Sequence, residues 1–331
     1  MNKRIPWNDL IGKSFTVFEP AIDWFVYTVS QANDKLPQGC KLDFKIIDSC
    51  FPEQYQNQNS QVLLTNNWIA PDALDTSRYE SLNPWFFGVY HGNHAQDDIE
   101  PTKAFNCLIR RMDPNRQSWL YQLVRRRILD QGHVSFNMDI SRHIMNGDAE
   151  PTESPHKVFQ RQFENHCGIF APEHEFIKHL VPYRSFSNDW TMEQVIMNSK
   201  FSLVLETYFI DPRMITVSEK TVRCLKLPRP WIVFSTRGTV NFLRQQGFDV
   251  LDDVVDHSYD IIDNDIDRQV SLLNLTQQMI QQPWTPDLLA RCKKAADHNS
   301  QLIEYWHKNF YREIKDAVSR AAEKCKQLQN K

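Results

Sequence analysis

Glycine is scarce in this sequence. An average composition of about 7% would give roughly 23 glycines in a chain of this length, and the 331 residues contain 9. Neither G-x-G-x-x-G nor G-x-x-x-x-G-K-[ST] occurs. These loops bring phosphate groups close to the backbone in standard Rossmann dehydrogenases and Walker-type NTPases, so both classes are disfavoured, as are glycine-looped kinases. A phosphorylated ligand would have to be held by side chains and helix ends.

Other features are missing as well. The 7 cysteines form no C-x-x-C pair, and such an odd, dispersed set predicts reduced thiols in a cytoplasmic protein. The start of the chain has no apolar segment of a secretory signal, and no stretch approaches the roughly 18 apolar residues of a membrane span. Lys and Arg number 38 against 41 Asp and Glu, which argues against nucleic-acid binding over the whole surface.

Short apolar segments alternate with helical patterns, which predicts parallel β-α-β units and an α/β fold. The expected strands are 14–20, 42–48, 61–65, 84–90, 104–109, 132–138, 201–209, 230–235 and 248–251. The expected helices are 21–34, 115–129, 156–166, 192–199, 218–227 and 239–246, followed by a helical tail that starts at Thr285-Pro286. We expect α/β domains at 1–100 and 101–284, connected by the polar segment 92–103, and C-terminal helices in 285–331.

The segment 201–220 is the densest candidate for a binding site. An apolar strand ends in Glu206, and Ser218-Glu219-Lys220 opens a helix. Ser218 is a good N-cap, and the N-terminus of a helix favours anions. Lys220 in the first turn could hold a diphosphate, and Glu206 or Glu219 could accept hydrogen bonds from a ribose. The alternative is an ordinary capped helix with a solvated Glu-Lys pair.

A second candidate is the segment 104–116, in which a strand leads into Arg110, Arg111 and Arg116. Guanidinium groups bind phosphates bidentately, and α/β sheets bind ligands at the carboxyl ends of their strands. The alternative is a solvated basic helix face, which fits the later arginines 125–127 best.

These motifs resemble a known family. A strand and an arginine-rich turn precede F-S-L-V-L-E-T-Y, S-E-K-T, P-W-I-V, F-L-R-Q-Q-G-F-D and S-Y-D-I-I-D. This order is similar to the donor-sugar domain of GT-B glycosyltransferases, in particular family 10 fucosyltransferases and their bacterial and viral relatives. The resemblance covers about 104–268, with Glu206-Thr207-Tyr208 where the family has Glu-Asn-Ser and Ser218-Glu219-Lys220 where it has Thr-Glu-Lys.

The resemblance implies a GT-B fold, in which two Rossmann-like domains face each other across a cleft. It also implies an inverting, metal-independent transfer from a nucleotide-sugar, with no cofactor besides this co-substrate. Glu219 and Lys220 would hold ribose and phosphate, Glu206 would contact the nucleotide, and an arginine of 110–116, preferably Arg110, would bind the diphosphate. The implied nucleotide-sugar ligands are Arg110, Arg116, Glu206, Ser218, Glu219, Lys220 and Tyr259.

An inverting transfer also needs a base that deprotonates the acceptor hydroxyl. In GT-B enzymes it usually comes from the N-terminal domain. Our first choice is Glu19, which directly follows the first expected strand, and Asp48 and Asp97 come next. Further candidates are Asp23, His91 and Asp98, and each of these groups is also readily explained as a solvated loop residue.

Two patterns suggest metals, and we discount both. Residues 249–268 hold eight aspartates, and their Asp252-Asp253 and Asp263-Asn264-Asp265 strings are similar to the metal-binding D-x-D of GT-A enzymes. An acidic run is usually a solvated face. The histidines of 174–179 are five residues apart, so they lie on different faces of a helix. We expect no metal site.

The sequence thus predicts a glycosyltransferase whose acceptor is a glycan, a lipid, a protein or a hydroxylated base in DNA, as in phage enzymes. A non-catalytic binding protein that kept the fold is the alternative. The tryptophans of the first domain suit stacking on sugars or bases, although they also fill cores; they are Trp7, Trp24, Trp68 and Trp85.

Overall fold

The computed structural model describes residues 27–38, 41–42, 44–47, 62–65, 67–69, 80–82, 99–109, 114–136, 181–182, 192–206 and 214–329. The chain divides into two compact units. Unit 1 comprises Met1–His91, Asp211–Val222 and Ser300–Lys331, and unit 2 comprises Gly92–Ile210 and Arg223–Asn299.

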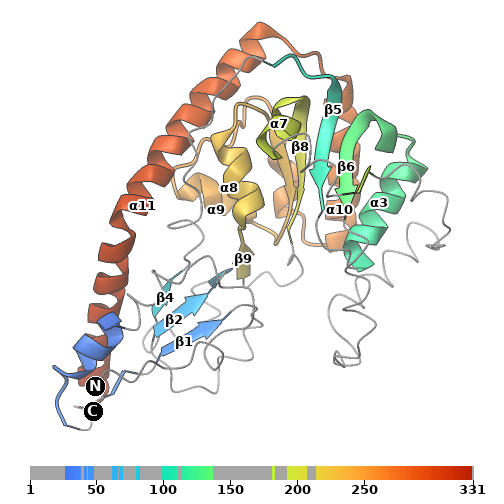
Figure 1. Ribbon diagram of the computed structural model, residues 1–331. Helices are drawn as coiled ribbons and strands as arrows, with labels where there is room; N and C mark the ends of the chain where they lie inside the picture. The colour runs from blue at the N-terminus through green and yellow to red at the C-terminus, as the bar shows by residue number, and fades with distance from the viewer. Residues whose placement is uncertain are drawn as a thin grey trace. The chain divides into compact units, whose positions relative to one another are not determined.

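Unit 2 contains a five-stranded parallel sheet in the order β10-β8-β5-β6-β7 (Figure 1). Its strands are β5 (Lys103–Leu108), β6 (Gly132–Phe136), β7 (Val181–Pro182), β8 (Ser199–Leu205) and β10 (Trp231–Phe234). The α/β class and the parallel sheet that the alternation predicted are therefore confirmed.

The helices of unit 2 follow the predicted pattern in part. They are α3 (Pro114–Arg125), α7 (Met192–Met197), α9 (Thr239–Gln245), α10 (Asp265–Gln281) and the 3₁₀ helices η5 (Leu129–Gln131) and η8 (His257–Ile261). The helix α8 (Glu219–Lys226) begins in unit 1 and ends in unit 2. Helix α10 was not predicted, and the predicted helix 156–166 lies outside the described residues.

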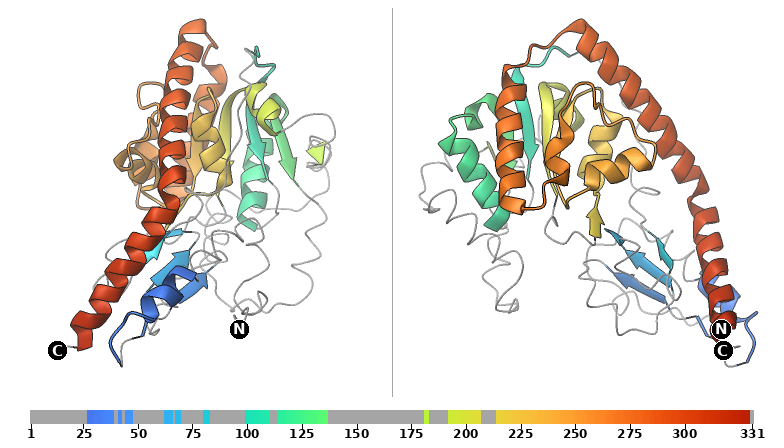
Figure 2. Two further views of the ribbon diagram at one scale, coloured as in Figure 1. Left: turned by 60° about the vertical axis from the view of Figure 1, so that its left-hand side comes forward. Right: turned by 180° about the vertical axis from the view of Figure 1, so that it is seen from behind.

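Helices α3 and α10 cover the same face of the sheet. The ring of Trp119 in α3 lies 5.0 Å from that of Phe234 in β10. The guanidinium of Arg268 in α10 lies 4.9 Å above the same Phe234 ring. Directly after α3, Arg126 donates a hydrogen bond of 2.8 Å to Asn274 of α10. The helices thus run side by side, as Figures 1 and 2 show.

One of the few glycines is required by packing. A Cβ atom at Gly132 would lie 2.5 Å from the ring of Phe105 on the neighbouring strand. That ring stacks on Phe201 at 5.8 Å and is fully buried. Any side chain at the start of β6 would push this aromatic pair apart.

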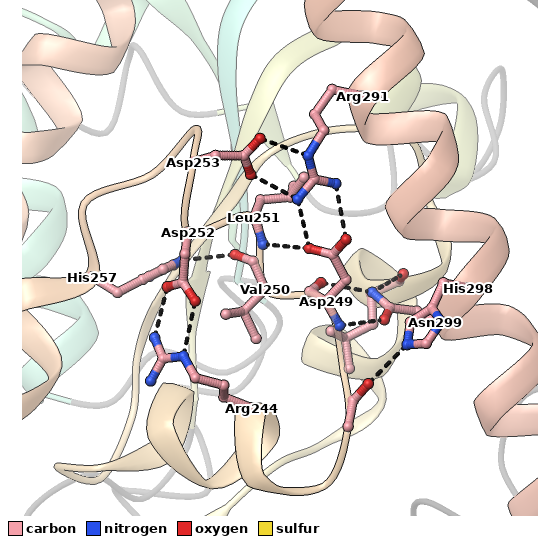
Figure 3. Close-up of polar contacts among 12 residues, drawn as sticks. Arg244, Asp249, Val250, Leu251, Asp252, Asp253, His257, Arg291, His298 and Asn299 are labelled. Carbon is pink, nitrogen blue, oxygen red and sulfur yellow. Dashed lines mark hydrogen bonds and ion pairs between the residues drawn. The ribbon is translucent and has the colours of Figure 1, made fainter.

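The strand predicted at 248–251 is wrong. The side chain of Asn299 accepts a hydrogen bond from the N–H of Asp249 and donates one to its carbonyl. The Asp249 side chain then accepts from the N–H of Leu251 at 3.0 Å, and Leu251 has a left-handed φ of 63°. The side chains of Asn299 and Asp249 thus provide hydrogen bonds to the backbone here, in place of those that a neighbouring strand would provide (Figure 3).

The tail is a single helix, α11 (Pro286–Gln329), which starts where the sequence predicted. The Thr285 hydroxyl accepts a hydrogen bond from the N–H of Leu288 at 3.2 Å, as an N-cap does. Buried apolar residues recur along one side of this helix at Ile303, Ile314, Ala317 and Ala321. Residues up to 299 belong to unit 2, and those from 300 onward belong to unit 1.

Unit 1 contains a three-stranded parallel sheet, β1-β2-β4, and an antiparallel pair, β3-β9. These strands are β1 (Phe44–Ile47), β2 (Val62–Thr65), β3 (Asn67–Ile69), β4 (Glu80–Leu82) and β9 (Met214–Thr216). Residues 27–33 are helical, within the predicted 21–34. Strands β1 and β2 lie within predicted segments, whereas the predicted strands 14–20 and 84–90 lie outside the described residues.

Two further observations concern the described residues. Their four cysteines are buried free thiols: Cys107, Cys224, Cys292 and Cys325. None of their helices combines the length and the apolar character that crossing a bilayer requires.

Candidate functional site

The strand order of unit 2 marks one edge of its sheet as the place for a ligand. From β5 the chain runs outward through β6 to β7, and it then returns to place β8 and β10 on the other side of β5. The direction of winding reverses between β5 and β8. In open α/β sheets, ligands bind beyond the carboxyl ends of the strands at such a reversal. The residues around the ends of β5 and β8 are therefore the candidates for a site.

Glu206 directly follows β8 and is only 2% exposed. Its N–H donates to the carbonyl of Phe234 at 3.0 Å, which continues the ladder between β8 and β10. Side chains alternate along a strand, so Glu206 lies on the same face as Ser202. Ser202 hydrogen-bonds with the thiol of Cys224 in α8, whose pKa burial raises to about 11, and the charge of Glu206 adds to that shift. The carboxylate is thus on the α8 side of the sheet.

Arg116, in the first turn of α3, reaches the same strand end. It is 4% exposed, and its Nη2 donates to the carbonyl of Leu205 at 3.3 Å. Leu205 is the residue immediately before Glu206. The structure therefore brings two of the predicted ligands, a guanidinium and a carboxylate, to the carboxyl end of β8.

Arg268 is a polar residue at this edge that the sequence interpretation missed. It is 1% exposed, and it donates to the carbonyl of Ser235, just after β10, and to Asp265 at 2.7 Å. The adjacent strands β8 and β10 thus each end against a buried arginine. A signal was available, because Arg268 is the one basic residue of the acidic run 249–268.

The start of α8 has the predicted cap. The Ser218 hydroxyl accepts from the N–H of Lys220 at 3.3 Å and from its ammonium at 3.2 Å. The ammonium also pairs with Glu219 at 3.2 Å, and the two side chains are 22% and 35% exposed. Lys220 therefore holds its charge beside the first N–H groups of the helix, where anions bind. These three residues belong to the segment Asp211–Val222 of unit 1, whereas Arg116 and Glu206 belong to unit 2.

Tyr259, another predicted ligand, lies in the core of unit 2. Its side chain is 1% exposed, and its hydroxyl accepts a hydrogen bond from the N–H of Val233 at 3.1 Å. Burial raises its pKa well above the ordinary value. In this position the ring fixes η8 against β10.

The acidic run is largely organised by arginines (Figure 3). Arg291 of α11 binds Asp249 at 2.9 Å and Asp253 at 2.7 Å, and Arg244 of α9 binds Asp252 at 2.6 Å. Hydrogen bonds from Arg291 lower the pKa of Asp253. The aspartates at 249–253 thus form ion pairs that hold α11 and α9 to the loop that follows α9. The run is therefore not simply a solvated face.

The two aspartates of the D-x-D-like string 263–265 also form ion pairs with arginines. Asp263 pairs with Arg237, and Asp265 pairs with Arg268. Within the described ranges, no three His, Cys, Asp or Glu residues come together in a way that could hold a metal ion.

The remaining predicted site residues lie outside the described part of the chain. They are the base candidates Glu19, Asp48 and Asp97 and the preferred diphosphate ligand Arg110, together with Asp23, His91 and Asp98. Comparison with protein-family models and with curated protein sequences gives no match to this chain.

Proposed function

We propose that the protein is a GT-B glycosyltransferase that moves a sugar from a nucleotide-sugar to an acceptor hydroxyl. The observation that carries this proposal is the end of β8 at the reversal point of a parallel sheet, where the buried Glu206 follows the strand and the guanidinium of Arg116 donates to the carbonyl of Leu205. The next helix begins with a capping Ser218 and with Lys220 in its first turn. The resemblance to family 10 fucosyltransferases adds support, because that family also has a glutamate after this strand and a Thr-Glu-Lys sequence where this chain has Ser218-Glu219-Lys220.

The chemistry follows from these groups. The acceptor oxygen attacks the anomeric carbon, the bond from that carbon to the diphosphate oxygen breaks, and the acceptor proton passes to a base. Negative charge then develops on the departing diphosphate. Fixed cations that face this charge stabilise the transition state without a metal ion. In our proposal, Lys220 and Arg116 supply that charge, and Glu206 and Glu219 hold the nucleotide.

The proposal assigns the acceptor to residues 1–100 and the base to an acid of that domain. Glu19 is the first candidate, followed by Asp48 and Asp97. Direct attack on the anomeric carbon inverts its configuration, so product stereochemistry is a readout of this mechanism.

The test begins with a panel of nucleotides and nucleotide-sugars in a thermal-shift assay. A ligand that binds only the native state raises the melting temperature, by an amount that grows with its concentration. The nucleotide-sugar that gives the largest shift is then incubated with acceptors, and released nucleotide diphosphate is measured. Exchange of Lys220 for alanine is expected to lower turnover about 10²- to 10³-fold, the usual effect of removing one donor to a developing oxyanion.

The matched control is Lys294→Ala on the exposed surface of α11, which should turn over like the wild type. Equal turnover in the Lys220→Ala variant would remove this lysine from the site. A nucleotide-sugar that binds without any release of nucleotide would favour the non-catalytic alternative, and no shift with any nucleotide would contradict the proposed function itself.

A further inference from the structure

The loop that follows α9 holds the first part of α11 in unit 2. Residues 247–256 are called the latch loop below. Within it, Leu251 is 2% exposed and packs in one apolar cluster with Cys292 and Ala295 of α11. Leu251 also has a left-handed φ of 63°, a conformation that costs free energy and persists only where the surrounding contacts hold it. The contacts of the neighbouring residues therefore decide whether this packing is kept.

His257 of η8 supplies one of these contacts from inside the core (Figure 3). It is 7% exposed, and its Nε2 lies 2.8 Å from the carbonyl of Val250, the residue before Leu251. A carbonyl only accepts, so Nε2 carries the hydrogen. Nδ1 lies 3.4 Å from the hydroxyl of Tyr259, which accepts from the N–H of Val233 and has its own proton to donate to Nδ1. The neutral ring thus uses one nitrogen as a donor and the other as an acceptor.

A second proton on the ring of His257 would disrupt this arrangement. The proton would occupy Nδ1, which now accepts from Tyr259. Its charge would lie in a buried site beside the rings of Trp231 and Tyr259, whose centres are 5.7 and 5.8 Å from that of the imidazole. Burial accordingly lowers the pKa of His257 below its ordinary value of 6.5. Once the latch loop opens, water reaches the ring and the proton binds at its ordinary pKa, so acid favours the open loop.

The charged groups around His257 do not cancel this effect. The carboxylates of Asp252 in the latch loop and of Asp260 in η8 favour the protonated ring, and the guanidinium of Arg244 in α9 disfavours it. The effect of burial on the pKa of His257 is larger than that of the two carboxylates. Asp260 does not itself open the loop, because burial raises its pKa and its protonation therefore favours the folded state.

The ion pairs of the latch loop are not the acid-sensitive part. Hydrogen bonds from arginines lower the pKa of Asp252 and of Asp253. For Asp249, burial acts upward, but its hydrogen bonds lower the pKa overall. These three carboxylates lose their charge only below their ordinary value of 3.8. As the pH falls from neutral to mildly acidic, the contact that changes is therefore that of His257.

We propose that the latch loop is an acid-sensitive switch, in which protonation of His257 opens residues 247–256 and releases the first part of α11. Movement of Val250 carries the adjacent Leu251 with it and withdraws its side chain from α11. The strands β5, β6, β8 and β10 pair with one another and not with this loop, so the opening is local. Residues of α11 from 300 onward belong to unit 1, so the switch regulates how firmly unit 2 holds a helix that the two units share. It does not depend on the proposed glycosyltransferase activity.

The test is hydrogen exchange of the full chain, measured by mass spectrometry at about pH 7 and about pH 5.5 and expressed as protection factors, which correct for the intrinsic effect of pH. About pH 5.5 is roughly one unit below the ordinary pKa of histidine, so linkage limits the increase in opening to about tenfold. We expect peptides from 247–256 and 288–299 to lose protection by roughly 3- to 10-fold. They should also be less protected than peptides from β8 and β10, which exchange when the whole unit unfolds.

The variant His257→Gln keeps an amide N–H for the carbonyl of Val250 and does not take up a proton in this range. Its latch loop should have the same protection at both pH values. The matched control is His298→Gln on α11. This exposed histidine also donates to a carbonyl of the loop, that of Gly247 at 2.8 Å, but water solvates the charge of its ring. The control should open in acid as the wild type does.

A measurement on the wild type covers the case in which His257→Gln does not fold. The titration of the His257 ring, followed by NMR, should have the same midpoint as the loss of protection, and a different midpoint would overturn the proposal. It is also overturned if the latch loop keeps its protection in acid, if His257→Gln opens like the wild type, or if His298→Gln abolishes the response. Protection of the loop as strong as that of β8 and β10 would equally overturn it, because the loop would then open only when the whole unit unfolds.

Discussion

Asn299 holds α11 to the loop that follows α9, and its replacement by leucine is the most direct test of this part of the fold. The side chain is 1% exposed. Its oxygen accepts from the N–H of Asp249 at 2.8 Å, and its nitrogen donates to the carbonyls of Asp249 and Leu225 at 3.0 and 3.1 Å. Leucine removes all three hydrogen bonds and leaves three main-chain groups without this partner.

The magnitude follows from that count. Each hydrogen bond contributes about 1 kcal/mol net, and a buried group left unsatisfied costs about 1–3 kcal/mol. Asp249 is partly exposed, so water can satisfy some of the loss, whereas Leu225 is fully buried. We expect Asn299→Leu to lower the free energy of unfolding of unit 2 by about 3 kcal/mol. For a unit of about 200 residues this corresponds to a fall of roughly 6–12 °C in melting temperature.

The assay is thermal unfolding followed by tryptophan fluorescence, because Trp119 and Trp231 are buried in unit 2. The matched control is Asn309→Leu on the same helix, where the asparagine bonds only to the carbonyl of Tyr305 among the contacts described. This exchange should change the free energy by no more than about 0.5 kcal/mol. A loss below 1 kcal/mol for Asn299→Leu would refute the reasoning that these three bonds are buried and necessary.

Three further predictions concern the site and the pH dependence. Glu19→Gln is expected to leave nucleotide-sugar binding intact and to abolish transfer, as measured by thermal shift and nucleotide release; a wild-type rate would move the role to another acid of residues 1–100. Turnover is expected to survive EDTA, whereas loss that manganese restores would implicate Asp263. Burial lowers the pKa of His257 below its ordinary value of 6.5, so the unfolded chain takes up a proton first as the pH falls. Unit 2 should therefore lose stability below about pH 6.5, and less so in His257→Gln; a melting temperature that is constant from pH 7 to 5 would contradict this.

The parts of the fold and of the candidate site that local sequence controls could be predicted. The end of β8 at Glu206, the Ser218 cap and the start of α11 at Thr285 depend on residues within a few positions of each other. Apolar runs, hydroxyl caps and proline act over that range. The structure reproduces each of these features.

The acidic run shows where local interpretation failed. Asp265 and Asp267 were taken as part of a solvated face, yet they form the first turn of α10. Asn264 caps that helix by accepting from the N–H groups of Ile266 and Asp267. Acidic residues in a first turn are favoured by the helix dipole. The sequence Asn264-Asp265-Ile266-Asp267 therefore predicts the start of a helix, and the interpretation missed it because it considered only the number of aspartates in the run.

Long-range contacts account for the rest. Arg291 binds Asp249 across 42 positions of the chain, and Arg268 reaches the carbonyl of Ser235 across 33. No local pattern encodes such a pairing. The strand predicted at 248–251 is wrong for the same reason. The backbone there forms its hydrogen bonds with the side chain of Asn299, which lies 50 positions away in the chain.

The division of the chain between the two units has a consequence for biosynthesis. Unit 1 takes its residues from the beginning, the middle and the last part of the chain, while unit 2 is encoded between them. At translation rates of about 5–20 residues per second, residues up to 91 wait roughly 10–40 s before residue 300 is made. During that interval β5, β6, β8 and β10 can already assemble, but the short strands of unit 1 still lack α11. The nascent chain can therefore complete its second unit before its first.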